Sequence, residues 1–324
     1  MKYTQLGRSG LTVSRLGLGT MNFGVHTPEP EAHAILDRAV DRGVNLVDTA
    51  NTYGSRLGAG ETEQIIGSWL AKDPARRDRI VLATKVYGMM GREPNAGRLS
   101  AIHIKKACED SLRRLGTDHL DVLQVHHVDR RTPWDETWQA LELLVAQGKV
   151  TYLGTSNFAG WHLTRAQEHA LHRGGVRPVS EQSVYNLLER TVELEVLPAC
   201  RNYGVGLLPY SPLHGGLLSG ALRRAAAGGR TGLPKSARQL QHHRDAVAAY
   251  EKWCADLERA PAQVAVAWLL HQPGVTAPIL GPRTVEQLED GLGALRISLD
   301  GDRLKELDAL FPGPKGPAPE AYAW

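Results

Sequence analysis

Residues 46–54 read LVDTANTYG, residues 80–86 read IVLATKV, and residues 120–127 read LDVLQVHH. Each stretch is a short apolar run, rich in β-forming residues, that ends on polar side chains. Amphipathic stretches with a helical period separate these runs, so the chain repeats a strand–helix unit. Eight such units predict an α/β fold, a (β/α)8 TIM barrel.

The eight barrel strands are expected to begin near Leu16, Val44, Ile80, Leu120, Val150, Val179, Val205 and Thr276. Helices are expected at 31–43, 61–72, 101–116 and 134–148, and three of these stretches end on a glycine, which is a common C-terminal stop. Residues 3–18 have alternating apolar positions around a glycine-bearing turn. They predict an N-terminal β-hairpin that covers the bottom of the barrel.

The connection between the seventh and eighth strands is much longer than the others, which predicts a long loop plus extra helices after strand seven. Residues 215–240 are rich in Gly, Arg and Ser, and a loop of this length is usually functional, so we expect it to contact cofactor or substrate. The chain has no other linker-like segment, so we expect residues 1–324 to form a single domain. The tail at 312–324 is expected to be irregular, with Tyr322 and Trp324 either docked on the barrel or free.

The composition is that of a globular protein. The chain has 324 residues, 42% of them hydrophobic and 23% charged, which is enough to bury a large core. A net charge of +3 without a long basic run argues against a nucleic-acid partner. No signal segment and no apolar run near the ~18 residues of a spanning helix are present, so we expect a cytoplasmic protein without a membrane partner. Three widely spaced cysteines predict neither disulfides nor a zinc site.

Four polar side chains follow three successive strands: Asp48 and Tyr53, then Lys85, then His126. The C-terminal ends of barrel strands share one face, and barrel enzymes carry their chemistry there. A tyrosine beside a cation is a plausible acid, because the cation favours tyrosinate and lowers a phenol pKa that starts near ~10. Lys85 closes an apolar strand and needs a carboxylate partner, which Asp48 can supply.

Each of these residues also has an interpretation without catalysis. Asp48 alone could cap the following loop, and Tyr53 alone could be a rim aromatic with a satisfied hydroxyl. Their joint placement at the ends of strands two, three and four favours a proton-transfer site. His126 and His127 are adjacent, so on a strand they are expected to face opposite sides, with only one of them in the site.

Two alternatives, a dinucleotide-binding Rossmann fold and a glycoside hydrolase, fit the sequence less well. GLGTMNFG at 17–24 has only the first two glycines of the dinucleotide-binding motif and lacks its following acidic residue, which argues against a Rossmann fold. A glycoside hydrolase needs two carboxylates across the barrel mouth. Glu181 precedes Gln182 on the sixth strand, so it faces away from the site if Gln182 faces in.

Four motifs together resemble the aldo-keto reductases. They are D-T-A-N-T-Y-G-x6-E at 48–61, T-K at 84–85, L-Q-V-H at 123–126 and G-T-S-N-F at 154–158. The resemblance runs over nearly the whole chain, from about residue 3 to residue 295. It is strongest with bacterial reductases of the group that also includes the potassium-channel β subunits.

This resemblance implies roles for the four polar side chains. Tyr53 would give a proton to the carbonyl oxygen of a small-molecule substrate, and Lys85, paired with Asp48, would lower the pKa of Tyr53. His126 would hydrogen-bond the same oxygen. A reduced nicotinamide would supply the hydride, and no metal would be needed.

The resemblance also implies a set of cofactor contacts. Those near the nicotinamide and its ribose would be Gly19, Thr20, Met21, Asp48, Ser156, Asn157 and Gln182. Stacking on the ring and contact with the pyrophosphate would come from Tyr210, Ser211, Pro212, Leu213, Gly215 and Arg238. The adenosine end would meet Gly281, Arg283, Gln287 and Asp290.

Arg283 bears on the choice between NADP and NAD. It lies where a helix opens after the eighth strand, a position that suits an anion, and its guanidinium can fork onto a ribose 2′-phosphate. The expected cofactor is therefore NADP(H). Gly291 departs from the family pattern, since many members carry an asparagine toward adenine there.

The candidate walls of the substrate pocket are Phe23, Tyr87, Met89, Met90, His127 and Trp161. This apolar and aromatic set suits hydrophobic aldehydes and ketones, so broad aldehyde reduction is expected, with a keto-sugar or polyketide ketone as a narrower alternative. A further alternative is an NADP-binding regulatory subunit with little turnover. The channel β subunits carry asparagine where this chain has His126, which favours the enzyme.

Overall fold

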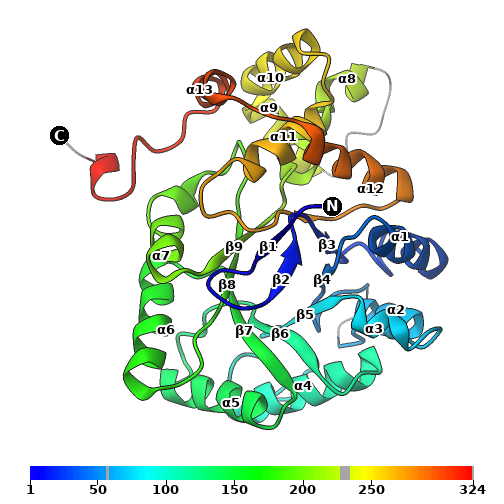
Figure 1. Cartoon of the computed structure of the whole chain (residues 1–324), viewed down its shortest axis with the longest axis vertical. Helices are drawn as coiled ribbons and strands as arrows, with labels where there is room; N and C mark the ends of the chain where they lie inside the picture. The colour runs from blue at the N-terminus through cyan, green and yellow to red at the C-terminus, as the bar shows by residue number, and fades with distance from the viewer. Residues whose placement is uncertain (56–57, 227–233, 323–324) are drawn as a thin grey trace.

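Eight parallel strands form a nearly closed barrel in the order β10-β3-β4-β5-β6-β7-β8-β9 (Figure 1). The computed structural model describes residues 1–55, 58–226 and 234–322. The strands are β3 (Gly17–Gly19), β4 (Leu46–Asp48), β5 (Val81–Val86), β6 (Leu120–Val125), β7 (Val150–Ser156), β8 (Ser180–Val184), β9 (Gly206–Tyr210) and β10 (Ile279–Leu280). An isolated parallel bridge between Leu207 of β9 and Val275, shortly before β10, joins the two ends of this strand order. The predicted TIM barrel is therefore confirmed.

Every predicted strand start lies within about three residues of an observed strand. The largest offset is at the eighth strand, which begins at Ile279 rather than Thr276. Pro278 immediately precedes it and has no N–H to donate to a neighbouring strand, so regular pairing begins only after the proline.

Helices follow the strands on the outside of the barrel. They are α1 (Glu29–Asp41), α2 (Glu61–Leu70), α3 (Ala75–Asp78), α4 (Ala101–Leu115), α5 (Trp134–Ala146), α6 (Gly160–Arg173), α7 (Val196–Tyr203) and α11 (Pro261–Leu270). The first turn of α4 is capped by the Ser100 hydroxyl, which accepts from the backbone N–H of His103 at 3.4 Å. Gly116 ends the same helix at φ 65°, a left-handed conformation that favours glycine.

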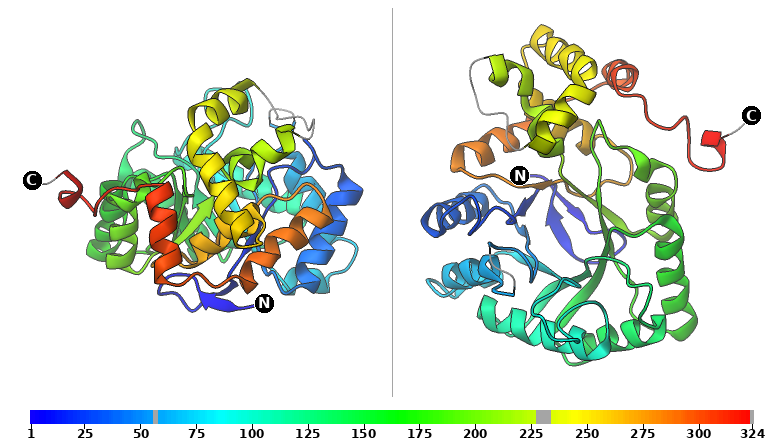
Figure 2. Two further views of the ribbon diagram at one scale, coloured as in Figure 1. Left: turned by 90° about the horizontal axis from the view of Figure 1, so that it is seen from above. Right: turned by 180° about the vertical axis from the view of Figure 1, so that it is seen from behind.

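The N-terminal hairpin pairs β1 (Tyr3–Gln5) with β2 (Thr12–Ser14) in antiparallel register, as predicted. It lies at one end of the barrel, and α8 and α9 lie at the other (Figure 2, left). Leu6 and Val13 are fully buried and belong to an apolar cluster with barrel residues from β4, β5, β6, β9 and β10. The hairpin therefore closes the bottom of the barrel with a packed apolar plug.

The long connection after β9 contains much helix. Its elements are η2 (His214–Ser219), α8 (Ala221–Ala226), α9 (Pro234–His242) and α10 (Arg244–Asp256), ahead of α11. The predicted loop at 215–240 is thus largely helical where it is described, and its residues 227–233 lie outside the described part of the chain. The predicted extra helices after strand seven are present.

The remaining elements are η1 (Thr191–Glu193), α12 (Val285–Leu292), η3 (Gly293–Arg296), α13 (Gly301–Leu310) and η4 (Glu320–Tyr322). Between α13 and η4 the tail has no regular element, and its Ala318 N–H donates to the Leu194 carbonyl oxygen at 2.9 Å, at the end of η1. Trp324 lies outside the described residues. Among the described helices, none has the length and apolar character needed to cross a bilayer.

Candidate active site

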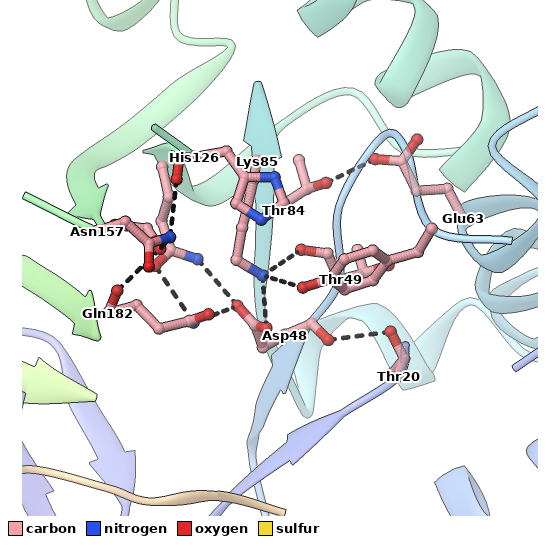
Figure 3. A network of polar contacts seen from close by, with 12 residues as sticks. Thr20, Asp48, Thr49, Glu63, Thr84, Lys85, His126, Asn157 and Gln182 are labelled. Atoms are coloured by element: carbon pink, nitrogen blue, oxygen red, sulfur yellow. Dashed lines mark hydrogen bonds and ion pairs between the residues drawn. The ribbon is translucent and has the colours of Figure 1, made fainter. Parts of the chain in front are cut away.

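Lys85 is the centre of a buried polar network at the C-terminal ends of β4 and β5 (Figure 3). Its ammonium Nζ donates to Asp48 Oδ2 at 2.6 Å, to the Thr49 carbonyl oxygen at 2.9 Å and to the Tyr53 hydroxyl oxygen at 3.2 Å. An ammonium has three N–H groups, so all three are used. The Tyr53 oxygen accepts from Lys85, which leaves the hydroxyl's own hydrogen for another acceptor.

Asp48 is held from both sides of its carboxylate. Its Oδ2 pairs with Lys85, while its Oδ1 accepts from the side-chain amides of Gln124 at 2.9 Å and Gln182 at 2.8 Å. Asp48 is 3% exposed and Lys85 is 1% exposed, so this ion pair is shielded from solvent. A buried pair is kept charged by such additional hydrogen bonds, because they replace the water that each group has lost.

Gln124 had been identified only as part of a motif and had no predicted role. The signal that could have revealed it is its position near the C-terminal end of a barrel strand, where the polar side chains of the site gather. Glu63 is a second residue that the sequence did not single out. It is fully buried, accepts from the Thr84 hydroxyl at 2.6 Å and pairs with Arg114, whereas the motif residue Glu61 binds the Ser55 backbone and hydroxyl instead.

Opposing effects set the pKa of Tyr53. Burial raises this pKa and is the largest effect, Lys85 lowers it through its charge and its hydrogen bond, as expected, and the nearby Asp48 raises it further. The net direction is therefore upward, because burial outweighs the cation. The phenol is protonated at neutral pH, as an acid must be before it donates.

The pKa of Lys85 shows why the cation persists. Burial alone would lower it, but the Asp48 carboxylate and the Tyr53 hydroxyl outweigh burial, and the net direction is upward. The ammonium also lies 4.9 Å from the centre of the Tyr53 ring, where the electron-rich face favours a cation. Lys85 therefore stays charged beside Tyr53.

His126 lies next to Tyr53, with ring centres 6.0 Å apart and planes at 75°. Burial lowers the pKa of His126 to about 3, helped by the charges of Lys85 and His127. The imidazole is thus neutral near pH 7 and offers one N–H donor and one nitrogen acceptor.

The expected divergence of His126 and His127 is wrong. Their rings stack with centres 5.0 Å apart and planes at 11°. The physical reason is that β6 ends at Val125, so both histidines follow the strand and its alternation does not apply to them. Tyr87 packs its edge against His127 at 5.3 Å, which extends the aromatic wall outward from the site.

A second group of polar contacts is centred on Asn157, directly after β7 (Figure 3). Asn157 has a left-handed backbone at φ 59°. Its amide Nδ2 donates to the His126 carbonyl oxygen at 3.1 Å and to Ser156 Oγ at 2.9 Å, and its Oδ1 accepts from the Tyr210 hydroxyl at 2.9 Å. Ser156 Oγ in turn donates to the Gln182 carbonyl oxygen at 2.8 Å. The predicted contacts of the nicotinamide amide therefore lie together.

The segment after β9 has an unusual backbone. Ser211, His214, Gly215 and Gly216 all have positive φ, at 53°, 46°, 64° and 96°. Within this segment the His214 and Gly216 N–H groups donate to the Ser211 and Leu213 carbonyl oxygens at 3.0 and 2.9 Å, so the chain makes successive tight turns. A side chain at Gly215 would meet no atom within 4 Å, so this point of the loop is open on the side where a Cβ would stand.

The residues predicted at the adenosine end lie just before α12 or on it. Arg283 is exposed, and its backbone N–H donates to Gln287 Oε1 at 2.9 Å. Asp290 Oδ1 accepts from the amide of Gln263 at 2.7 Å, so this carboxylate has a partner within the protein. Gly281 is exposed beside them, while Arg238 lies on α9 with an exposed side chain.

The residues after β3 are placed differently from one another. Gly19 is buried, and a Cβ there would stand 2.7 Å from Ile279, which explains the need for glycine. Thr20 is buried and bonds to the Asp48 carbonyl oxygen at 2.9 Å, while Met21 is 61% exposed.

Phe23 is fully buried in the main apolar core and has no surface for a substrate, which corrects its expected place in the pocket wall. Its carbonyl oxygen accepts from Thr62 Oγ1, so α2 covers the segment that carries it.

Comparisons with known proteins agree with this architecture. The aldo/keto reductase family model matches residues 15–311. An oxidoreductase of Bacillus subtilis named YrpG is 52% identical over the full length of both chains. The protein tas of Escherichia coli is 36% identical, with 98% of this chain and 100% of tas covered. The versiconal hemiacetal acetate reductase of Aspergillus parasiticus is 32% identical, with 97% of this chain and 99% of that enzyme covered.

The match covers the barrel strands, the polar network around Lys85 and the segment after β9 in one continuous stretch. Members of this family are oxidoreductases that use nicotinamide cofactors. The barrel, its C-terminal polar site and the extended similarity together show that this chain belongs to the aldo/keto reductase family.

Proposed function

We propose that this protein reduces aldehydes and ketones to alcohols with NADPH, and that Tyr53 is the proton donor. The main support for this proposal is that all three Lys85 N–H groups donate hydrogen bonds, one of them to the Tyr53 hydroxyl oxygen. This arrangement directs the phenol hydrogen away from Lys85. It also holds a cation beside the oxygen that becomes negative when the proton leaves.

The residues of the site suit a nicotinamide cofactor. Ser156, Asn157 and Gln182 would hold the amide of the nicotinamide, Tyr210 would stack on its ring, and the positive-φ segment that includes Gly215 would meet the pyrophosphate. A reduced nicotinamide bound there would supply the hydride to the carbonyl carbon. Arg283, exposed at the start of α12, is the group proposed to read the 2′-phosphate of NADPH.

The proton transfer follows from the described contacts. As the carbonyl oxygen gains an electron pair, Tyr53 gives it the phenol proton, and the resulting tyrosinate is stabilised by Lys85. Neutral His126 would donate an N–H to the same oxygen and orient the substrate. Asp48 keeps Lys85 in place, and the two glutamine amides hold Asp48.

The pocket residues support hydrophobic carbonyl substrates. Met89 and Trp161 are 44% and 56% exposed, and Tyr87 packs against His127. Met90 lies beside Met89 and is partly buried. We infer broad aldehyde reduction from this apolar and aromatic set. If a panel of aromatic and aliphatic aldehydes gives no NADPH oxidation while a nucleotide keto-sugar does, the narrower ketoreductase replaces it.

The test is NADPH oxidation by the purified protein with that aldehyde panel, run beside Tyr53→Phe. The variant should keep NADPH binding and lose turnover by about a hundred- to ten-thousandfold, because it lacks the proton donor. Tyr203→Phe is the matched control, since the Tyr203 hydroxyl donates to Glu168 on the helix surface. Turnover retained by Tyr53→Phe would exclude Tyr53 as the acid, and tight NADPH binding by wild type without any turnover would favour the regulatory subunit.

A further inference from the structure

Glu181 is a buried carboxyl that the proposed chemistry does not use. It is 0% exposed and lies on β8 beside Gln182. Gln182 reaches into the barrel to Asp48, so alternation turns Glu181 outward, toward the layer of helices, where Cys200 of α7 is close enough to feel its charge. Within the described ranges, Glu181 has no ion-pair partner.

The Glu181 carboxyl is instead surrounded by hydrogen-bond donors. Its Oε2 accepts from the Thr155 hydroxyl at 2.5 Å, and its Oε1 accepts from the Ser183 hydroxyl at 2.6 Å and from the Phe158 backbone N–H at 3.1 Å. These three donors take the place of an ion-pair partner, because a buried polar group must find hydrogen bonds within the protein. Two of them lie on either side of the turn at Ser156 and Asn157.

That turn depends on outside support. Asn157 has a positive φ, a conformation that is unfavourable for L-residues and is tolerated by asparagine better than by most. Its backbone N–H is anchored to the Gln182 carbonyl oxygen at 3.0 Å, and the next N–H, of Phe158, is anchored to Glu181. Adjacent residues of β8 thus hold adjacent N–H groups of the turn, Gln182 through its backbone carbonyl and Glu181 through its side chain.

We propose that Glu181 is a positioning residue that clamps the Ser156–Phe158 turn and thereby sets the affinity for the nicotinamide end of the cofactor. This inference rests on the proposed function, because the turn carries the two side chains assigned to the nicotinamide amide. Glu181 itself would touch neither cofactor nor substrate. Its effect passes through the backbone of the turn, which places Asn157 against His126 and Tyr210.

The test compares three substitutions in the full-length protein, with the dissociation constant of NADPH measured by quenching of tryptophan fluorescence. Glu181→Leu removes every acceptor and should weaken NADPH by about tenfold, the loss expected when one backbone anchor of the turn is released. Glu181→Gln keeps an oxygen for Phe158 and should bind within about twofold of wild type. Saturating NADPH should restore most of kcat in Glu181→Leu, since the turn acts on binding.

Glu193→Leu is the matched control. Glu193 is also a largely buried carboxylate, but it bonds to Tyr185 and Arg190 near α13. The Glu193→Leu substitution should lower the urea concentration at the midpoint of unfolding without changing NADPH affinity. If Glu181→Leu does not fold, Glu181→Asp serves in its place, because a side chain shorter by one methylene withdraws from the Phe158 N–H.

Two results would overturn the inference. In the first, wild type binds NADPH and a folded Glu181→Leu or Glu181→Asp binds it equally well. This result would remove the clamp and leave the proposed function intact. A wild type that binds neither NADPH nor NADH would remove the proposed function and the clamp together. Weaker NADPH binding by Glu181→Leu, together with binding close to wild type by Glu181→Gln, supports the clamp. A general loss of stability would weaken NADPH binding in the Glu193→Leu control as well.

Discussion

The two ends of the proposed cofactor site are held in different ways. At the nicotinamide end, Asp48 and Lys85 are almost fully buried, and their partners come from several barrel strands. At the adenosine end, Arg283 is exposed, and its backbone N–H donates to the side chain of Gln287, four residues away. The groups proposed for proton transfer are thus fixed by buried strand ends, while the arginine proposed to select NADPH lies on the exposed rim.

Lys85→Met should have the largest effect. It removes the cation beside Tyr53 and leaves the Asp48 carboxylate buried without its partner, so kcat should fall by about a hundred- to ten-thousandfold and the free energy of unfolding by about 3–5 kcal/mol. Steady-state NADPH oxidation and urea unfolding measure the two losses. Lys106→Met is the control, because Lys106 pairs with Asp110 at the surface of α4. Near wild-type turnover in Lys85→Met would contradict the proposed role of the cation.

Glu181→Gln should change how stability depends on pH. Burial raises the pKa of Glu181 to about 7, above the ~4.3 of an unfolded chain. A raised pKa means that the folded state binds the proton more tightly. Stability from this group is therefore complete below about pH 4 and is lost as pH rises to 7, by up to about 3 kcal/mol.

Urea unfolding of wild type and Glu181→Gln at several pH values between 4 and 8 measures this loss. The variant has no titrating group there, so its advantage over wild type should grow up to pH 7 and then stay constant. The other titratable groups that feel the charge of Glu181 are Cys200 on α7 and Tyr210 on β9, and the pKa of each is raised from a value already above 7. A difference independent of pH would show that Glu181 titrates as an ordinary carboxyl.

Arg283→Ala should have the smallest effect of the three and should be confined to the cofactor. Loss of charged hydrogen bonds to a 2′-phosphate should weaken NADPH by about ten- to a hundredfold and leave NADH unchanged. Fluorescence titration with both nucleotides measures the ratio. Arg303→Ala, on the exposed surface of α13, is the control. Equal losses for both nucleotides would mean that Arg283 does not read the phosphate.

The barrel and the central part of the site could be predicted because their signals are local. Strand runs such as LVDTANTYG alternate with helical stretches, and glycines such as Gly116 stop helices where a positive φ is needed. Once the strands are parallel, their ends meet on one face. That alone brings Asp48, Lys85 and His126 together.

Other features could not be read from local patterns. The stacking of His126 on His127 follows from the end of β6 at Val125, and pattern alone does not fix strand ends to one residue. The burial of Phe23 depends on how α2 covers it, and the role of Gln124 depends on a partner 76 residues away. These are contacts between distant parts of the chain.

Periodicity, turn residues and strand direction are properties of short segments, so the order of the elements and the four side chains at the strand ends follow from the amino-acid sequence alone. Which atom each polar group meets, and how far each is buried, depends on contacts between distant segments and is fixed only in the folded barrel. The upward pKa of Tyr53 shows the consequence, since the competition between burial, Lys85 and Asp48 is settled by distances across the barrel. The same holds for Glu181, whose three donors lie on β7, on β8 and in the turn between β7 and α6 and come together only when the barrel closes.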